Sequence, residues 1–255
     1  MTVVRTELQA DVAVITIDRP GARNAIDPEV ARGIEEAMDL VEGDSAIRVA
    51  ILTGTAPVFC AGADLRAVGA GDGPLLSTER GGFAGFVRRE RTVPVIAAVD
   101  GAALAGGFEL VLACDLVVAS TAARFGLPEV TRGLVASAGG LFRVGRVLPR
   151  NLGMQLALTG EPIDAEVAHR YGLVNFLCEP GSALETAKRL AATIAGNAPL
   201  AVRASRAVVT ECTFADDSTG WEHSSAANDK VVASEDIDEG VRAFIEKRPP
   251  VWKGR

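Results

Sequence analysis

Short runs of consecutive apolar residues recur along the first two-thirds of the chain and alternate with amphipathic stretches. The runs are too short for helices and rich in Val and Ile, which is typical of strands that are buried on both faces. Strands are predicted on this basis at residues 12–17, 49–54, 93–99, 116–119 and 174–177. Strand–helix alternation of this kind predicts an α/β layer architecture.

A helix is predicted from Asp27-Pro28, which reads as an N-cap followed by proline at the first helical position. Apolar residues then follow at helical spacing, which predicts one buried face: Val30, Ile34, Ala37 and Val41. From about residue 183 the strand signal fades, and helices are predicted at 183–195, 200–212 and 237–247. We therefore divide the chain into a core, residues 1–195, and a helical C-terminal region, residues 196–255.

Composition narrows the class of protein. The 255 residues are 48% hydrophobic, so a sizeable core can form and disorder of the whole chain is excluded. A formal net charge of −7 argues against a global grip on nucleic acid. No apolar run reaches membrane-span length and the N-terminus shows no secretory pattern, so we expect a soluble, cytoplasmic protein without a membrane partner.

The four cysteines, Cys60, Cys114, Cys178 and Cys212, are each more than thirty residues from the next. No pair has the spacing of a metal or redox motif, so reduced structural thiols and no metal site are expected.

Several common catalytic motifs are missing from the sequence. Gly69-Ala70-Gly71-Asp72-Gly73 does not follow a strand as a dinucleotide loop would, and neither a P-loop nor a Gly-x-Ser-x-Gly elbow occurs. His169 and His223 are expected on exposed, polar stretches, which disfavours a Ser/His/Asp hydrolase. Residues 69–85 hold six glycines and are predicted to be a flexible connection or a mobile lid.

A glycine pair, Gly106-Gly107, lies between a strand and the apolar helical run 108–113. The Gly106 N–H would sit at the helix N-terminus without an intrahelical partner, and no Cβ would prevent a ligand oxygen from approaching it. The small-residue turn at 59–65 follows another strand and could supply a second N–H. Together they suggest an oxyanion site, although each is also compatible with an ordinary glycine turn.

Two carboxylates border apolar segments. Glu109 lies in the first turn of the predicted helix, and Glu129 follows Pro128 in a mostly apolar run. Carboxylates beside apolar walls can hold different protonation states and act as an acid and a base. The alternative is that Glu109 merely favours the helix start and that Glu129 is a surface turn residue.

The chain resembles the crotonase (enoyl-CoA hydratase/isomerase) superfamily over essentially its whole length. Single motifs are weak, but their order and spacing together are specific. The motifs that carry the resemblance are Asp18-Arg19-Pro20 with Asn24-Ala25, Ala61-Gly62-Ala63-Asp64-Leu65, Pro94–Gly101, Gly106-Gly107-Phe108-Glu109-Leu110 with Cys114-Asp115, Phe125-Gly126-Leu127-Pro128-Glu129, Gly139-Gly140, Leu158-Thr159-Gly160, Gly172-Leu173-Val174-Asn175 and Glu239-Gly240 through Phe244–Arg248.

The resemblance implies a spiral of ββα units followed by a helical C-terminal trimerisation region, in a homotrimer or a dimer of trimers. It implies an acyl-CoA thioester substrate whose carbonyl lies between the N–H groups of Ala63 and Gly106. Coenzyme A is part of that substrate, and no cofactor or metal is implied. By motif position Glu109 and Glu129 are the catalytic pair, while Arg23, Ala61, Asp64, Leu65 and Lys247 fall at CoA-binding positions, Lys247 possibly from across a subunit boundary.

The predicted reaction is hydration of 2-enoyl-CoA, with Glu109 as the base toward water and Glu129 as the acid toward Cα. The stretch Leu134-Val135-Ala136-Ser137-Ala138 departs from the family pattern, and the tail after Phe244 looks similar to carnitinyl-CoA dehydratases. Dehydration of a carnitinyl-type thioester, enoyl-CoA isomerisation and a non-catalytic acyl-CoA-binding protein remain as alternatives.

Overall fold

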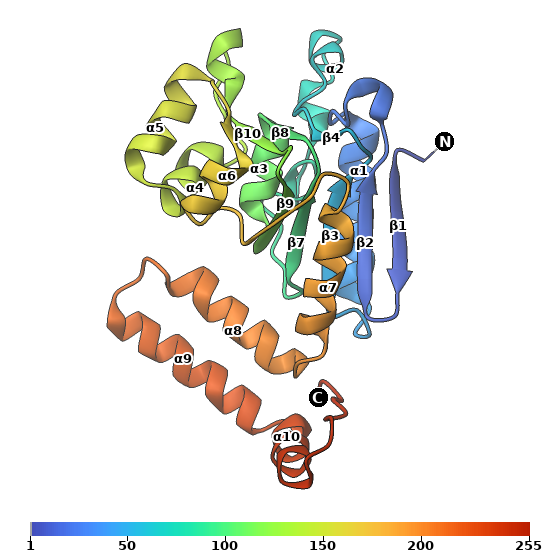
Figure 1. Cartoon of the computed structure of the whole chain (residues 1–255), viewed down its shortest axis with the longest axis vertical. Coiled ribbons are helices and arrows are strands. Elements are labelled where there is room, and N and C mark those ends of the chain that lie inside the picture. Colours follow the sequence, from blue (N-terminus) through green and yellow to red (C-terminus); the bar gives the residue numbers. More distant parts are fainter. Residues whose placement is uncertain (1) are drawn as a thin grey trace.

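A six-stranded sheet, in the order β1-β2-β3-β7-β9-β12, forms the centre of the computed structural model, which describes residues 2–255 (Figure 1). β1 pairs antiparallel with β2, and all other neighbours in this sheet are parallel. Its strands are β1 (Val4–Gln9), β2 (Val12–Ile17), β3 (Val49–Gly54), β7 (Val95–Val99), β9 (Leu116–Ser120) and β12 (Phe176–Cys178).

The central strands β2, β3, β7 and β9 are covered on both faces, which explains why their sequences are continuous apolar runs. Ile15 and Leu52 point to the main core, which also contains the buried face of helix α1 (Pro28–Gly43). Val14 and Ile51 point to the other face, where helix α7 (Ala183–Ala195) packs with three buried alanines.

A second sheet carries the segments that lead into the site. Its order is β11-β10-β8-β4, and β4 and β10 both run parallel to β8. Its strands are β4 (Val58–Cys60), β8 (Ala102–Leu104), β10 (Arg124–Gly126) and β11 (Ile163–Asp164). Short helices follow three of them: α2 (Leu65–Gly69), α3 (Gly106–Ala113) and the 3-10 helix η3 (Pro128–Arg132).

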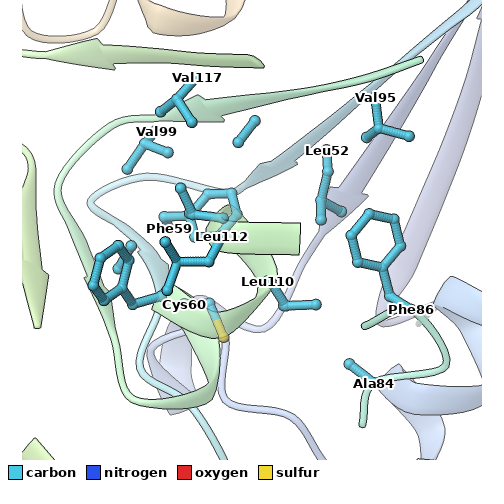
Figure 2. Close-up of a cluster of buried hydrophobic side chains, with 14 of the residues drawn as sticks. Leu52, Phe59, Cys60, Ala84, Phe86, Val95, Val99, Leu110, Leu112 and Val117 are labelled. Atoms are coloured by element: carbon cyan, nitrogen blue, oxygen red, sulfur yellow. The ribbon is translucent and has the colours of Figure 1, made fainter. Parts of the chain in front are cut away.

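Helix α3 is anchored in the main core. Leu110 and Leu112 lie among Phe59, Cys60 and Leu52 (Figure 2). The first seven residues of this eight-residue helix are all buried. Such burial fixes the position of both ends of the helix, including the N-terminal end at Gly106.

The first predicted helix forms as expected. The Asp27 side chain accepts a hydrogen bond from the Val30 N–H at 2.9 Å, Pro28 is the first helical residue, and all four predicted apolar positions are buried. The remaining short elements are η1 (Pro20–Ala22), α4 (Gly140–Val147), α5 (Arg150–Thr159) and α6 (Ala165–Arg170).

Three helices follow α7 and lie apart from the six-stranded sheet (Figure 1). They are α8 (Pro199–Cys212), α9 (Asp217–Val232) and α10 (Glu235–Glu246). α8 and α10 match predicted helices, whereas α9 was not predicted. Of the helices formed by residues 2–255, none has the length and apolar character that crossing a membrane requires.

The glycine-rich stretch at 69–85 contains defined elements. It forms the 3-10 helix η2 (Gly73–Leu76) and the hairpin of β5 (Ser77–Thr78) and β6 (Gly82–Phe83), with Leu76 buried. Glycines serve close packing here, because a Cβ on Gly81 would lie 2.1 Å from the Gly85 carbonyl oxygen. The prediction of a flexible connection or a mobile lid rested on glycine content alone, which does not reveal these short elements.

Candidate active site

A cavity of about 1070 Å³ contains most of the predicted site residues. It lies where the turns after β4, β8 and β10 meet the hairpin β5–β6 and the start of α4. The predicted residues that line it are Arg23, Ala61, Ala63, Leu65, Gly106, Glu109 and Glu129.

Two backbone amides border this cavity at one point. β4 and β8 are parallel neighbours, so the turns that follow them emerge on the same side. A Cβ on Gly62 would lie 3.0 Å from the Gly106 nitrogen, which shows how closely the two turns approach. Within residues 2–255 no hydrogen-bond acceptor is assigned to the N–H of Ala63 or of Gly106. Both residues line the same cavity, so their free N–H groups lie on adjacent turns beside it.

The residue before α3 is held in an uncommon conformation. Ala105 has φ 51° and ψ −129°, a backbone geometry that favours glycine. Its N–H donates to the Gly126 carbonyl at 2.9 Å, and its carbonyl accepts from Phe108 and Glu109. Such strain persists where the surroundings impose it, and here it sets the direction of the Gly106 N–H.

Glu109 is buried in the wall of the cavity with 3% of its surface exposed. Its Oε1 accepts the Gly140 N–H at 2.8 Å. Burial raises the pKa of Glu109 to about 7; the negative charge of Glu129 adds to this rise, while the Gly140 N–H and Arg143 oppose it. Glu109 is therefore a carboxyl group that changes protonation near neutral pH.

Glu129 lies in η3, on another wall of the same cavity. Burial raises its pKa, and the charge of Arg132 opposes this shift. Its Oε2 is buried and has no hydrogen-bond partner among the described residues. A buried carboxyl oxygen without a partner beside a cavity is available to a ligand.

The turn that carries Arg23 is fixed by a buried asparagine. The Asn24 side-chain amide donates to the carbonyls of Thr55 and Val58 at 2.8 and 2.6 Å, and its Oδ1 accepts the Arg19 N–H. Arg23 itself has φ 55° and its carbonyl accepts the Ala61 N–H. These bonds place Arg23 and Ala61 together on one wall.

Two predicted residues do not line the cavity. The Asp64 carboxylate caps α2 and pairs with Arg19 at 3.2 Å. Although burial works in the opposite direction, hydrogen bonds from the Arg66 N–H and from Arg19 lower the pKa of Asp64. Lys247 follows α10, away from the cavity of its own chain. Its predicted contact across a subunit boundary stays a prediction.

Phe83, Arg88 and Arg143 are among the cavity residues that were not predicted from the sequence. Phe83 packs against Gly106, since a Cβ on Gly106 would be 2.5 Å from its ring. Arg88 and Arg143 line the cavity, as does the exposed Ser137 of the stretch that departs from the family pattern. No local signal in the sequence pointed to Arg143, because a cation on an amphipathic helix is typical of an exposed face.

The chain is similar to known proteins along nearly its whole length. The family model for enoyl-CoA hydratase/isomerase matches residues 7–255. The chain is 41% identical to mevalonyl-coenzyme A hydratase of Aspergillus fumigatus, covering 95% of this chain and 91% of that protein. It is 40% identical to carnitinyl-CoA dehydratase of Salmonella typhi, covering 94% of both. The chain belongs to the enoyl-CoA hydratase/isomerase family.

A solved structure of the family has the same fold along the whole chain. A crystal structure of enoyl-CoA hydratase from Mycobacterium tuberculosis superposes with a TM-score of 0.96 at 46% identity, covering all of both chains. The predicted crotonase fold is thereby confirmed. The family members matched here are named hydratases and dehydratases of CoA thioesters, and the chain is a hydratase-type lyase of the same family.

Proposed function

We propose that this enoyl-CoA hydratase/isomerase family member adds water reversibly to 2-enoyl-CoA thioesters, giving 3-hydroxyacyl-CoA. One observation carries the proposal: two glutamates with raised pKa values, Glu109 and Glu129, share a cavity with the unpartnered amides of Ala63 and Gly106. Hydration of an enoyl thioester requires both elements, an oxyanion donor pair and an acid–base pair.

The thioester oxygen accepts hydrogen bonds from the N–H groups of Ala63 and Gly106. These bonds polarise the carbonyl and stabilise the enolate that forms when water adds at Cβ. The water oxygen bonds to Cβ while Glu109 takes a proton from the water. Glu129 delivers a proton to Cα. The net change is addition of one water across the double bond, and proton exchange with solvent restores both glutamates. The residues require no metal or further cofactor for these steps.

The CoA part of the substrate is assigned to the wall that holds Arg23, Ala61 and Leu65. Arg23 supplies a positive charge for a phosphate, and the small side chain of Ala61 leaves room along the turn. Asp64 acts indirectly, because its pairing with Arg19 fixes the turn. Lys247 would reach CoA from another copy of the chain.

An assembly through the C-terminal region, residues 196–255, is part of the proposal. Large apolar side chains are exposed on α8–α10, including Trp221 at 73% and Phe244 at 85%. An apolar groove of about 370 Å³ between α8 and α10 contains Leu200, Phe244 and Trp252. Apolar surface of this extent is typical of a protein interface, and we propose a homotrimer or a dimer of trimers.

The test is hydration of crotonyl-CoA by the purified full-length protein, followed as loss of enoyl absorbance. The wild type is expected to hydrate it, while Glu129→Gln loses on the order of 10²–10⁴ in rate. Glu166→Gln changes an exposed glutamate on α6 and serves as the control. Binding of CoA thioesters without turnover at any chain length would show a binding protein instead.

Dehydration of a 3-hydroxyacyl-CoA is the reverse of the same steps. It should be tested too, because relatives of this chain are named both as hydratases and as dehydratases. A carnitinyl-CoA dehydratase and a mevalonyl-CoA hydratase are both about equally similar to this chain. Product analysis also detects isomerisation, which moves the double bond without adding water. Finding only the shifted alkene would replace hydration by isomerisation.

A further inference from the structure

The proposed reaction gives no role to an aromatic side chain of the cavity wall, Phe142. It lies in the first turn of α4, lines the cavity and is half-exposed. The helix buries Gly140 and Val144 instead, so the ring does not belong to the packed face of α4. Leu134 and Val135, which are also exposed, line the same cavity. A half-exposed ring in such a wall offers apolar surface to a ligand.

Phe142 is placed beside the loop that holds Glu109. A Cβ on Gly139 would lie 3.2 Å from Cζ of the Phe142 ring, so the tip of the ring contacts this glycine. The next residue, Gly140, donates its N–H to Glu109 at 2.8 Å. Through these contacts the ring neighbours the carboxyl group that acts at Cβ of the substrate. Because Cβ carries the remainder of the acyl chain, this part of the wall is open to that chain.

The Phe142 ring is flanked by two guanidinium groups. The Cζ atoms of Arg143 and Arg146 lie 5.1 and 5.0 Å from its centroid. Arg146 also lies 5.4 Å from the centroid of Phe214. All three distances are within the range of about 6 Å in which a cation is attracted to a ring face. Phe142, Arg146 and Phe214 thus form a stack, which we call the Phe142 column.

The Phe142 column connects the cavity wall with the helical C-terminal region. Phe142 and Arg146 are one turn apart on α4, the spacing at which side chains of a helix face each other. Phe214 lies in the segment between α8 and α9. Arg146 is exposed, so the two rings hold its guanidinium where a free side chain would sample several rotamers. The C-terminal region therefore supports the Phe142 ring through Arg146.

We propose that Phe142 is a specificity-determining residue, whose ring binds the acyl chain beyond Cβ, and that Arg146 and Phe214 are positioning residues that hold this ring. The proposal rests on the proposed function, in which Glu109 acts at Cβ, and narrows its substrate class to CoA thioesters with an alkyl chain longer than four carbons. Each CH₂ group that packs on the ring is removed from water and adds to affinity. A crotonyl group ends one methyl after Cβ and gains least.

The test of the specificity role measures binding of saturated thioesters, which need no turnover. Butanoyl-CoA and octanoyl-CoA differ only in chain length, and calorimetry on the full chain gives their dissociation constants. We expect the wild type to bind octanoyl-CoA about tenfold or more tightly, and Phe142→Ala to reduce this preference about fivefold. Leu158→Ala, which removes an exposed leucine of α5 outside the cavity lining, is the control and should keep the preference.

The positioning role is tested with the same two thioesters. Arg146→Gln and Phe214→Ala should each reduce the chain-length preference about twofold to threefold, with little change for butanoyl-CoA, because an exposed cation–π contact is weak. Arg146→Lys keeps a cation and should retain more of the preference than Arg146→Gln. Arg150→Gln, which changes an exposed arginine of α5, is the matched control and should behave as the wild type.

The preference is a ratio within one variant, so a partial loss of folded protein does not affect it. Equal binding of both thioesters by the wild type overturns the specificity role. In Phe142→Ala an unchanged preference, an increased preference or an equal weakening of both thioesters also overturns it, because the ring then does not bind the chain. An unchanged preference in both Arg146→Gln and Phe214→Ala overturns the positioning role.

Failure of this proposal can be distinguished from failure of the proposed function. Hydration of crotonyl-CoA by a protein without the chain-length preference contradicts the role of Phe142 alone. The preference in a protein that hydrates no enoyl-CoA contradicts the proposed reaction alone.

Discussion

Glu109 and Gly140 are joined by a 2.8 Å hydrogen bond, although they belong to different helices, α3 and α4. The bond fixes one carboxyl oxygen of Glu109 at the N-terminus of α4, where a negative charge is favoured. Burial and the neighbouring Glu129 act in the opposite direction and prevail, since the pKa of Glu109 is raised to about 7. The site thus holds a carboxyl group in balance between its two protonation states.

The first prediction concerns the pH dependence of catalysis. If Glu109 is the base, kcat/KM for a short enoyl-CoA should fall as the pH drops through about 7. The positive charge of Arg143 lowers the pKa of Glu109, so Arg143→Gln should move this limb to higher pH. A pH–rate profile of both proteins measures it, and an acid limb near the pKa of an ordinary glutamate would contradict the assignment.

The second prediction concerns stability. A folded-state pKa raised above the ordinary glutamate value of 4.5 means that the folded protein holds the proton more tightly, so stability falls as the pH rises from about 4.5 to 7. Glu109→Gln cannot ionise and should be more stable than the wild type at pH 8, by about 3.5 kcal/mol at most, because one pKa unit is worth about 1.4 kcal/mol. Denaturant unfolding at several pH values measures this difference. Equal stability of the two proteins across the range would contradict it.

The third prediction separates two adjacent glycines. In Gly107→Ala the new Cβ lies 2.2 Å from the backbone oxygen of Cys60, whereas in Gly106→Ala it lies 2.5 Å from the side chain of Phe83. A ring can move but a buried strand cannot, so Gly107→Ala should cost about 3 kcal/mol of stability or more. Gly106→Ala should cost less stability and lower kcat at least about tenfold by disturbing the donor. Thermal unfolding and kinetics on both variants provide the comparison, and the reverse order of stabilities would be inconsistent with the packing.

The fourth prediction concerns the attachment of α8. Asp115 accepts from Arg206 of α8 at 3.0 Å and from the Val95 N–H at 2.8 Å, and it lies 3.5 Å from the buried Arg91. Asp115→Ala leaves these cations without their carboxylate, which should cost about 3–5 kcal/mol. Urea unfolding measures the loss, with Glu185→Ala, which removes an exposed pair with Lys188, as the control. A similarly small effect in both variants would show that Asp115 does not hold α8.

The central strands of the sheet could be predicted well from the sequence because they are buried on both faces. The segments 12–17 and 49–54 match β2 and β3 residue for residue, since every position but one is buried. Helix α9 escaped prediction because it contains no buried residue and so no apolar periodicity. Strands of two or three residues, such as β4 and β11, are too short to show any periodicity.

Site residues could be predicted where their residue type is unusual for the surrounding sequence. Glu109 stands out as a carboxylate in an apolar helix, and Gly106 as a glycine at a helix start. Arg143 does not stand out, because a cation on an amphipathic helix reads as an exposed face. Its position depends on the carbonyls of Val87 and Ala138, and the link to Val87 spans more than fifty residues.

The most direct test of the joint role of the two glutamates is a double-mutant cycle on the hydration of crotonyl-CoA. Residues that act in one step are not additive, so Glu109→Gln with Glu129→Gln should be scarcely slower than the slower single variant. Each single variant should lose on the order of 10²–10⁴ in kcat/KM. Single variants that retain wild-type rates would contradict the account.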